Sequence, residues 1–271
     1  FFAIFIGKWS LFIPLFANYF YLIMYFLMVY SFVYSGNIKR NLFFYFLTFS
    51  AFTPALITQA MDQCADFPLA CHYAFLFFAI FEYLKTSKKL TFYILSLQLG
   101  FLPSMKNEGL ILFILILIFL LLSFFSRLEK KEKVISSIVV LVPLVFYIIY
   151  KYIAPELNPV PVTFAHIKNS LLDFQRYFNL AKYFTVFHLF LLICSVPIIV
   201  IYFYRKKFKN TYFYFPILAS HVAYSSILLI TSSDQLWHLT TAYARINFQL
   251  IPAFFLVSFF IYSENQTIDR N

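Results

Sequence analysis

Six consecutive residues from Ser104 to Gly109, with the sequence SMKNEG, interrupt an apolar run from about Leu90 to Phe125. One helix over that run would be roughly 54 Å long, against a hydrocarbon core of about 30 Å. Each charge near the centre of a bilayer costs about 2.5 to 3.5 kcal/mol. We therefore expect the chain to turn here, with Lys106 and Glu108 lining a polar cavity. The alternative is an interfacial turn with a self-neutralising Lys/Glu pair.

Two other segments carry polar residues that are unusual between apolar helices. In the first, Asp66 lies two residues before Pro68, so its carboxylate serves either a polar site or the positive end of a helix. In the second, Arg245 could bind a phosphate through its guanidinium or snorkel to the interface. His238 could be a phosphate ligand, a proton carrier or an ordinary interfacial histidine, and Trp237 fits an interfacial aromatic belt.

These side chains are expected to meet at one membrane face, and they define the predicted substrate-binding set: Asp66, Lys106, Glu108, His238 and Arg245. Basic groups there would hold the phosphate of an anionic lipid headgroup. Acidic groups would orient hydroxyls or a divalent metal, and no other cofactor is indicated.

The composition indicates an integral membrane protein. Of the 271 residues, 62% are hydrophobic, 23% are aromatic and only 12% are charged, which a water-soluble domain could not accommodate. The net charge of +10 does not indicate nucleic acid binding, because 14 of the 21 Lys and Arg residues lie in five separated places. These are 39–40, 85–89, 127–133, 205–209 and 270. They alternate with turns that are poor in basic residues, as the positive-inside rule expects of cytoplasmic loops.

The predicted fold is a single all-α transmembrane domain over residues 1–271. Hydropathy and charge predict nine crossings: 10–34, 42–60, 66–84, 90–105, 109–126, 134–152, 183–204, 212–231 and 247–263. With every basic cluster inside, residue 1 starts outside, so we expect an upstream segment with an outward crossing. The outward regions would be 61–66, the break at Lys106, the connection 153–182 and the segment 232–246.

The outer connection over residues 153–182 is expected to contain one amphipathic helix on the membrane surface. Apolar residues recur there at 167, 171, 174 and 178, which is helical spacing. Phe174 and Phe178 would dip into the lipid headgroups. The cysteines, including Cys71, fit small buried hydrophobic residues, and a disulfide between Cys64 and Cys71 is an alternative that the spacing does not favour.

Three motifs together resemble the GT-C class of integral-membrane glycosyltransferases, particularly bacterial members related to dolichyl-phosphate-mannose protein mannosyltransferases. The motifs are CADFPLA at 64–70, KNEGL at 106–110, and WHL at 237–239 followed by Thr241, Arg245, Gln249 and Pro252. Each motif alone is weak, and their order and spacing carry the resemblance. The chain departs from the pattern at Ala244, where relatives commonly have Asp, so Arg245 is expected to lack a local carboxylate partner unless Asp234 supplies one.

The resemblance implies a GT-C-like bundle that transfers a sugar, with inversion, from a polyprenyl-phosphate donor to a lipid-linked glycan or protein acceptor. The reaction would occur at the outer face of a bacterial inner membrane, in assembly of the cell envelope. Lys106 and Arg245 would stabilise the leaving phosphate, assisted by His238, while Asp66 would position the acceptor or the sugar and Glu108 would hold Lys106. The catalytic base of the family lies in a first outer loop, expected upstream of residue 1.

Two other classes of function remain open from the residues. A transporter of an anionic or lipid-linked solute would also use intramembrane charges. It should, however, place polar residues at mid-membrane on both sides of a gate, whereas the inner halves of these segments are nearly pure Phe, Leu and Ile. A purely structural membrane subunit would leave the outward clustering of charges without a reason.

Overall fold

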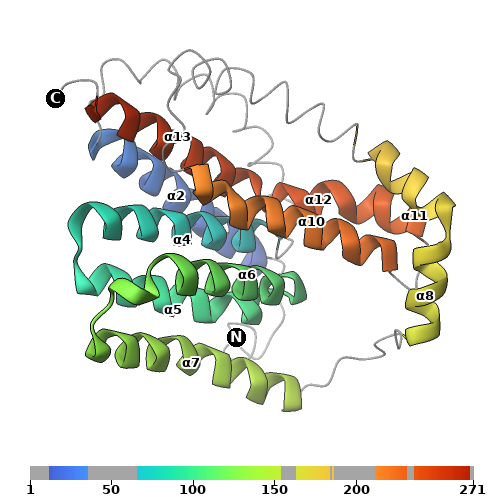
Figure 1. Cartoon of the computed structure of the whole chain (residues 1–271), viewed down its shortest axis with the longest axis horizontal. Coiled ribbons are helices and arrows are strands. Elements are labelled where there is room, and N and C mark those ends of the chain that lie inside the picture. The colour runs from blue at the N-terminus through green and yellow to red at the C-terminus, as the bar shows by residue number, and fades with distance from the viewer. Residues whose placement is uncertain are drawn as a thin grey trace.

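The computed structural model describes residues 12–35, 66–153, 163–183, 185, 211–230 and 235–268. These residues are almost entirely helical and contain no strand (Figure 1). The elements in chain order are α2 (Phe12–Ser35), α4 (Asp66–Thr86), α5 (Lys89–Met105), α6 (Asn107–Ser123), η1 (Phe125–Arg127), α7 (Lys130–Ile153), α8 (Phe164–Leu172), η2 (Thr211–Tyr214), α10 (Phe215–Ile230), α11 (Gln235–His238), η3 (Leu239–Tyr243), α12 (Ala244–Phe248) and α13 (Ile251–Ile268).

The all-α prediction is thus confirmed for the described residues, and the membrane character is supported in part. Three helical segments are long and apolar enough to cross a membrane: Asp66–Thr86, Lys130–Ile153 and Tyr212–Ile230. The predicted crossing 42–60, and all but the first residues of 183–204, lie outside the described residues. The shorter helices α5 and α6 have 17 residues each, about 25 Å of helix.

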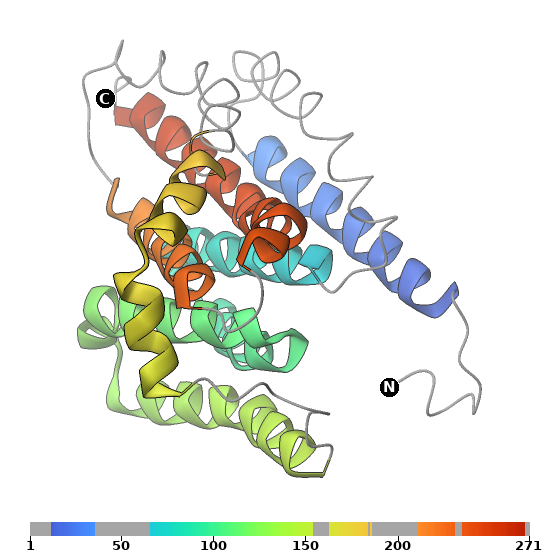
Figure 2. The same cartoon turned by 90° about the vertical axis from the view of Figure 1, so that its right-hand side faces the viewer.

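Helix α4 lies at the centre of the bundle. It packs against α2, α5, α12 and α13, and its Tyr73 hydroxyl lies 3.3 Å from the Ser220 hydroxyl on α10. In Figure 2, α4 is surrounded by these helices, while α7 lies at the periphery beyond α5 and α6. A helix that is apolar on all sides is suited to such a position. Its free Cys71 is buried, as expected for a small hydrophobic residue.

Aromatic rings fill the core between α4, η2 and α13. Phe81 stacks on Phe260 with ring centroids 3.9 Å apart, and Phe213 meets both rings edge to face. Such contacts add about 0.5 to 1.5 kcal/mol per pair beyond the burial of apolar area. The high aromatic content therefore serves helix packing here.

The turns that join α4 to α5 and α6 to α7 lie at one end of the bundle, and the junction of α5 and α6 lies at the other (Figure 1). The basic clusters 85–89 and 127–133 fall in or beside the first two turns. The Lys106 break is therefore at the opposite end from both clusters. This is the alternation predicted from the distribution of Lys and Arg.

The break itself is one residue wide. Lys106 has an extended backbone. It is the C-cap of α5 and also the N-cap of α6. The Gly109 amide closes the new turn by donating to the Lys106 carbonyl over 2.9 Å. A Cβ added at Gly109 would lie 2.0 Å from the carbonyl oxygen of Leu102, so only glycine lets the two helices approach this closely.

The prediction of a single amphipathic helix in the outer connection is wrong in one respect. Helix α8 ends at Leu172, Asp173 has an extended backbone, and a second helical segment covers 174–183. The carboxylate of Asp173 accepts from the Gln175 amide over 2.9 Å, so it acts as an N-cap that starts the second helix. Phe174 and Phe178 are exposed, as a surface helix requires, and α8 runs across the end of the bundle (Figures 1 and 2).

Candidate polar site at the helix break

A buried carboxylate, that of Asp66, forms the centre of the site. Asp66 is the first residue of α4 and is only 1% exposed. Its Oδ1 lies 2.7 Å from Nζ of Lys106, and its Oδ2 lies 3.0 Å from Nε of Arg245. The carboxylate also lies in the first turn of the helix, where the helix dipole favours a negative charge. The two interpretations of Asp66, site residue and helix-end charge, are thus compatible.

Lys106 is held between two carboxylates. Besides Asp66, its Nζ lies 3.1 Å from Oε1 of Glu108, which is in the first turn of α6. Because Lys106 is the single extended residue between two helices, its backbone is fixed on both sides. The side chain is 24% exposed, so it is partly accessible to solvent.

Arg245 reaches the same carboxylate from the other side of the site. The Nε atom of Arg245 is buried and is not aligned for a hydrogen bond, so its 3.0 Å contact with Asp66 is a charge contact. The side chain is nevertheless 39% exposed, and this exposure belongs to its other atoms. Among the described residues, the two terminal nitrogens of the guanidinium donate no hydrogen bond. They therefore keep their donors for an anion.

The helix type changes just before Arg245. The segment η3, which lies between α11 and α12, is a π-helix. Such turns are rare and frequently occur at functional sites, because the extra residue rotates the following side chains. A sequence pattern based on 3.6 residues per turn does not predict this rotation.

Two residues of the site were not predicted as binding residues. The side-chain amide of Gln249 donates to Oδ1 of Asp66, and its carbonyl oxygen accepts from the Tyr224 hydroxyl over 3.2 Å. Gln249 is fully buried. It lies four residues after Arg245, so the i, i+4 spacing places both on one helix face, a signal that was available in the sequence. No local signal points to Tyr224, which comes from α10.

A second polar contact fixes α12 against α10. Asn247 is 1% exposed and donates to the Tyr243 carbonyl over 2.8 Å, while its side-chain oxygen meets Nδ1 of His221. Buried amides that use both ends in this way restrict the rotation of the helix that carries them. The backbone of Arg245, between Tyr243 and Asn247, is therefore held firmly.

The formal charges of Asp66, Glu108, Lys106 and Arg245 sum to zero, yet their exposure is unequal. The carboxylate of Asp66 is buried, whereas Lys106 and Arg245 are 24% and 39% exposed. A ligand that approaches from solvent therefore meets the cations before the buried carboxylate. Since Glu108 also pairs with Lys106, Arg245 is the cation with the most remaining capacity.

The predicted alternative role of the acidic groups, holding a divalent metal, does not fit this arrangement. Both oxygens of Asp66 are engaged by cations and by Gln249. No group of three or more His, Cys, Asp or Glu side chains that could hold a metal occurs in the described part of the chain. The carboxylates here serve as partners of basic side chains.

The structure brings four of the five predicted residues together: Asp66, Lys106, Glu108 and Arg245. The fifth, His238, ends the short helix α11, and its side chain is outside the described atoms, as are Asp234 and Cys64. Arg245 was expected to lack a local carboxylate partner unless Asp234 supplied one; its partner among the described residues is Asp66, from a distant segment.

These contacts define the site by its own geometry: a buried carboxylate that orients two partly exposed cations at the end of the bundle away from the basic turns. Comparison of the chain with family models, with curated proteins and with solved structures finds no match.

Proposed function

We propose that this chain is a polytopic membrane glycosyltransferase that uses a polyprenyl-phosphate-linked sugar as its donor. The observation that carries the proposal is the pair of cations, Lys106 and Arg245, anchored on the buried carboxylate of Asp66, with no hydrogen bond from the terminal guanidinium nitrogens to any described residue. A phosphate that gains negative charge as it leaves a sugar needs such fixed donors.

In the proposed reaction, the bond between C1 of the sugar and the phosphate oxygen breaks, and a bond from an acceptor hydroxyl to C1 forms with inversion. The acceptor, a lipid-linked glycan or a protein, loses its hydroxyl proton to a base. The products are the glycosylated acceptor and free polyprenyl phosphate. Arg245 takes the largest share of the developing charge, Lys106 a smaller one, and Asp66 and Glu108 act as positioning residues.

The proposed membrane arrangement has nine crossings with the basic turns in the cytoplasm of a bacterial inner membrane. The basic clusters 85–89 and 127–133 are then inside, and the Lys106 break faces outward. The exposed phenylalanines of 174–183 would lie in the outer headgroups. This arrangement supports an acceptor that arrives from the outer side.

Cysteine labelling tests the arrangement without disturbing the ion pairs. Ser104 is exposed and adjoins the break, and Lys130 is exposed at the start of α7. With the native cysteines replaced, a membrane-impermeant maleimide should label Ser104→Cys in intact cells and Lys130→Cys only after lysis. Labelling of both from the same side would overturn the topology.

The activity test uses membranes that contain the protein, a radiolabelled polyprenyl-phosphate sugar and extracted acceptor. Arg245→Ala should abolish transfer, and Arg245→Lys should not restore it, because an ammonium that pairs with Asp66 has no second pair of planar donors. Lys106→Met should weaken donor binding less than Arg245→Ala. Lys131→Gln, a surface change on α7, is the matched control.

The same assay separates transfer from transport. A transporter would move the lipid-linked sugar unchanged, whereas a transferase releases free polyprenyl phosphate in equal amount to glycosylated acceptor. Full transfer by Arg245→Ala, or movement of intact donor without its cleavage, would contradict the proposal.

A further inference from the structure

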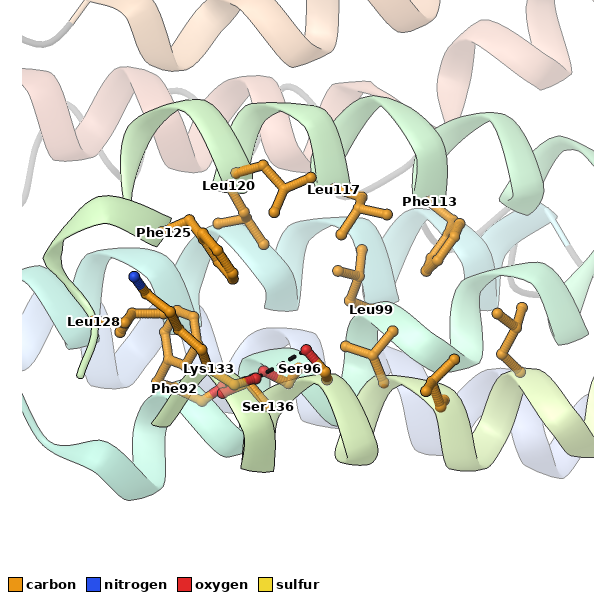
Figure 3. Close-up of a pocket in the computed structure, with 15 residues that line it drawn as sticks. Phe92, Ser96, Leu99, Phe113, Leu117, Leu120, Phe125, Leu128, Lys133 and Ser136 are labelled. Carbon is orange, nitrogen blue, oxygen red and sulfur yellow. Dashed lines mark hydrogen bonds between the residues drawn. The ribbon is translucent and has the colours of Figure 1, made fainter. Parts of the chain in front are cut away.

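A groove of about 380 Å³ lies between α5, α6 and α7, near the basic end of the bundle. Its walls are apolar, with Leu99 on α5, Leu117 and Leu120 on α6 and Leu144 on α7 among the residues that line it. Figure 3 shows Lys133 and Phe125 at one end of the groove and Phe113 at the other. Leu121 and Leu141 on its rim are 45% and 51% exposed, so the groove opens to the surface of the bundle.

The depth of the groove corresponds to one leaflet of a bilayer. Lys133 and Leu144 both line it and are 11 positions apart on α7, which corresponds to a rise of about 16 Å. Half of a hydrocarbon core is about 15 Å. Helix α7 turns many large apolar side chains outward along this length, so its outer face is suited to lipid. An acyl chain of the adjoining leaflet could therefore lie in the groove along its whole length.

One end of the groove carries a cationic side chain, that of Lys133. Nζ of Lys133 lies 4.8 Å from the centroid of the Phe125 ring. The two nearby carboxylates, Glu129 and Glu132, are both taken by Lys89, at 3.2 Å and 3.0 Å. Among the described residues no carboxylate pairs with Lys133. A cation at the mouth of an apolar groove is complementary to a lipid that carries a negative headgroup.

A buried polar atom inside the groove has no partner. Ser136, one turn along α7 from Lys133, is 8% exposed, and its hydroxyl has no hydrogen-bond partner in the described structure. A buried hydroxyl without a partner is costly, and in native proteins such groups are nearly always satisfied by another polar group or by ordered water. The ester and glycerol oxygens of a phospholipid lie close to its phosphate, as Ser136 lies close to Lys133.

We infer that this groove binds one anionic phospholipid of the leaflet on the basic side, with its phosphate on Lys133, an ester oxygen near Ser136 and an acyl chain between α6 and α7. The site is at the opposite end of α5 and α6 from Asp66 and is independent of sugar transfer. It requires only that these helices lie in a bilayer.

The test uses the whole chain in vesicles of phosphatidylcholine that contain a minor fraction of phosphatidylglycerol with a photoactivatable group in mid-chain. After irradiation, mass spectrometry of the peptides should place the label on α5, α6 and α7 at the groove. The same probe with a phosphatidylcholine headgroup should label about fivefold less, the effect of one interfacial lysine. Equal labelling by the two probes, or no labelling of the groove, would overturn the inference.

Two matched pairs of variants sharpen the result. Lys133→Gln should lower labelling by phosphatidylglycerol about fivefold, and Lys131→Gln, an equal change of charge on the same helix, should leave it unchanged. Leu117→Trp should fill the groove and remove the label, while Leu122→Trp, at a 78% exposed position outside the groove, should not. If Leu117→Trp does not fold, the Lys133 comparison still decides, and equal effects of Lys133→Gln and Lys131→Gln would contradict a specific site.

Discussion

From the contacts of Asp66 we predict an unusual effect on stability: once the two cations are removed, removal of the carboxylate should stabilise the protein. Asp66 is 1% exposed, whereas its two cationic partners are 24% and 39% exposed. Removal of the cations leaves a buried carboxylate without compensation. Removal of the carboxylate leaves cations that can turn to solvent. The two perturbations should therefore differ greatly in cost.

The double variant Lys106→Met with Arg245→Gln should lose about 3 to 5 kcal/mol, the usual effect of leaving a buried charge unpaired. Asp66→Asn should lose only about 1 to 2 kcal/mol, because an amide at this position can still accept from Gln249 and both cations remain partly hydrated. When Asp66→Asn is added to the double variant, the triple variant should regain at least about 1 kcal/mol, because the unpaired charge is gone.

The free energy of unfolding can be measured by titration of mixed micelles with dodecyl sulfate, followed by circular dichroism. Glu82→Gln is the matched control: its pair with Lys85, at 3.9 Å, is about 30% exposed on both sides and lies at the other end of α4. Its loss should cost less than about 1 kcal/mol. A triple variant that is less stable than the double variant would refute the assignment of Asp66 as the compensated buried charge.

Three further predictions concern the packing and capping of the helices. Gly109→Ala should destabilise the protein by about 1 to 3 kcal/mol, because the added Cβ would overlap the Leu102 carbonyl oxygen; an unchanged unfolding midpoint would show that α5 and α6 can separate freely. Asp173→Ala should cost about 1 kcal/mol locally and speed amide exchange at the start of the segment 174–183, whereas equal exchange rates would remove its role as an N-cap. Phe260→Ala should cost about 3 to 5 kcal/mol through loss of the stack on Phe81, and a loss below about 1 kcal/mol would mean that the aromatic core repacks.

The fold could be predicted from the sequence where hydropathy and turn chemistry agree. The apolar run from Leu90 was expected to break at Lys106, and α5 and α6 meet there. The predicted ends of these two helices differ from the observed ones by at most three residues, since hydropathy does not register the polar first turn of α6 or the point where an apolar helix stops. The break at Asp173 was missed because the apolar spacing continues across it, although an Asp before a helix is a recognised start signal.

The sequence predicts which residues form the site better than it predicts the contacts between them. Charge placement predicted that Asp66, Lys106, Glu108 and Arg245 share one end of the bundle. The sequence does not show that one carboxylate serves both cations. Asp66 is far along the chain from Arg245, and 183 positions from its other partner Gln249, and only the packing of α4 against α12 and α13 brings these residues together. The sequence predicts that Arg245 lacks a carboxylate partner nearby in the chain, and it does not predict that Asp66, from a distant segment, takes that place.

The position of the charges follows from the geometry of the break. A long loop would let Lys106 turn to water, and fixing its side chain in the site would then carry a large conformational entropy cost. Here the loop is reduced to one extended residue between two helices, and Gly109 draws those helices together. Asp66, at the start of the central helix, lies within 2.7 Å of the ammonium that this turn presents. The donors are thus oriented by folding before any ligand arrives, and the proposed transfer requires this, because fixed charges stabilise a leaving phosphate more effectively than water does.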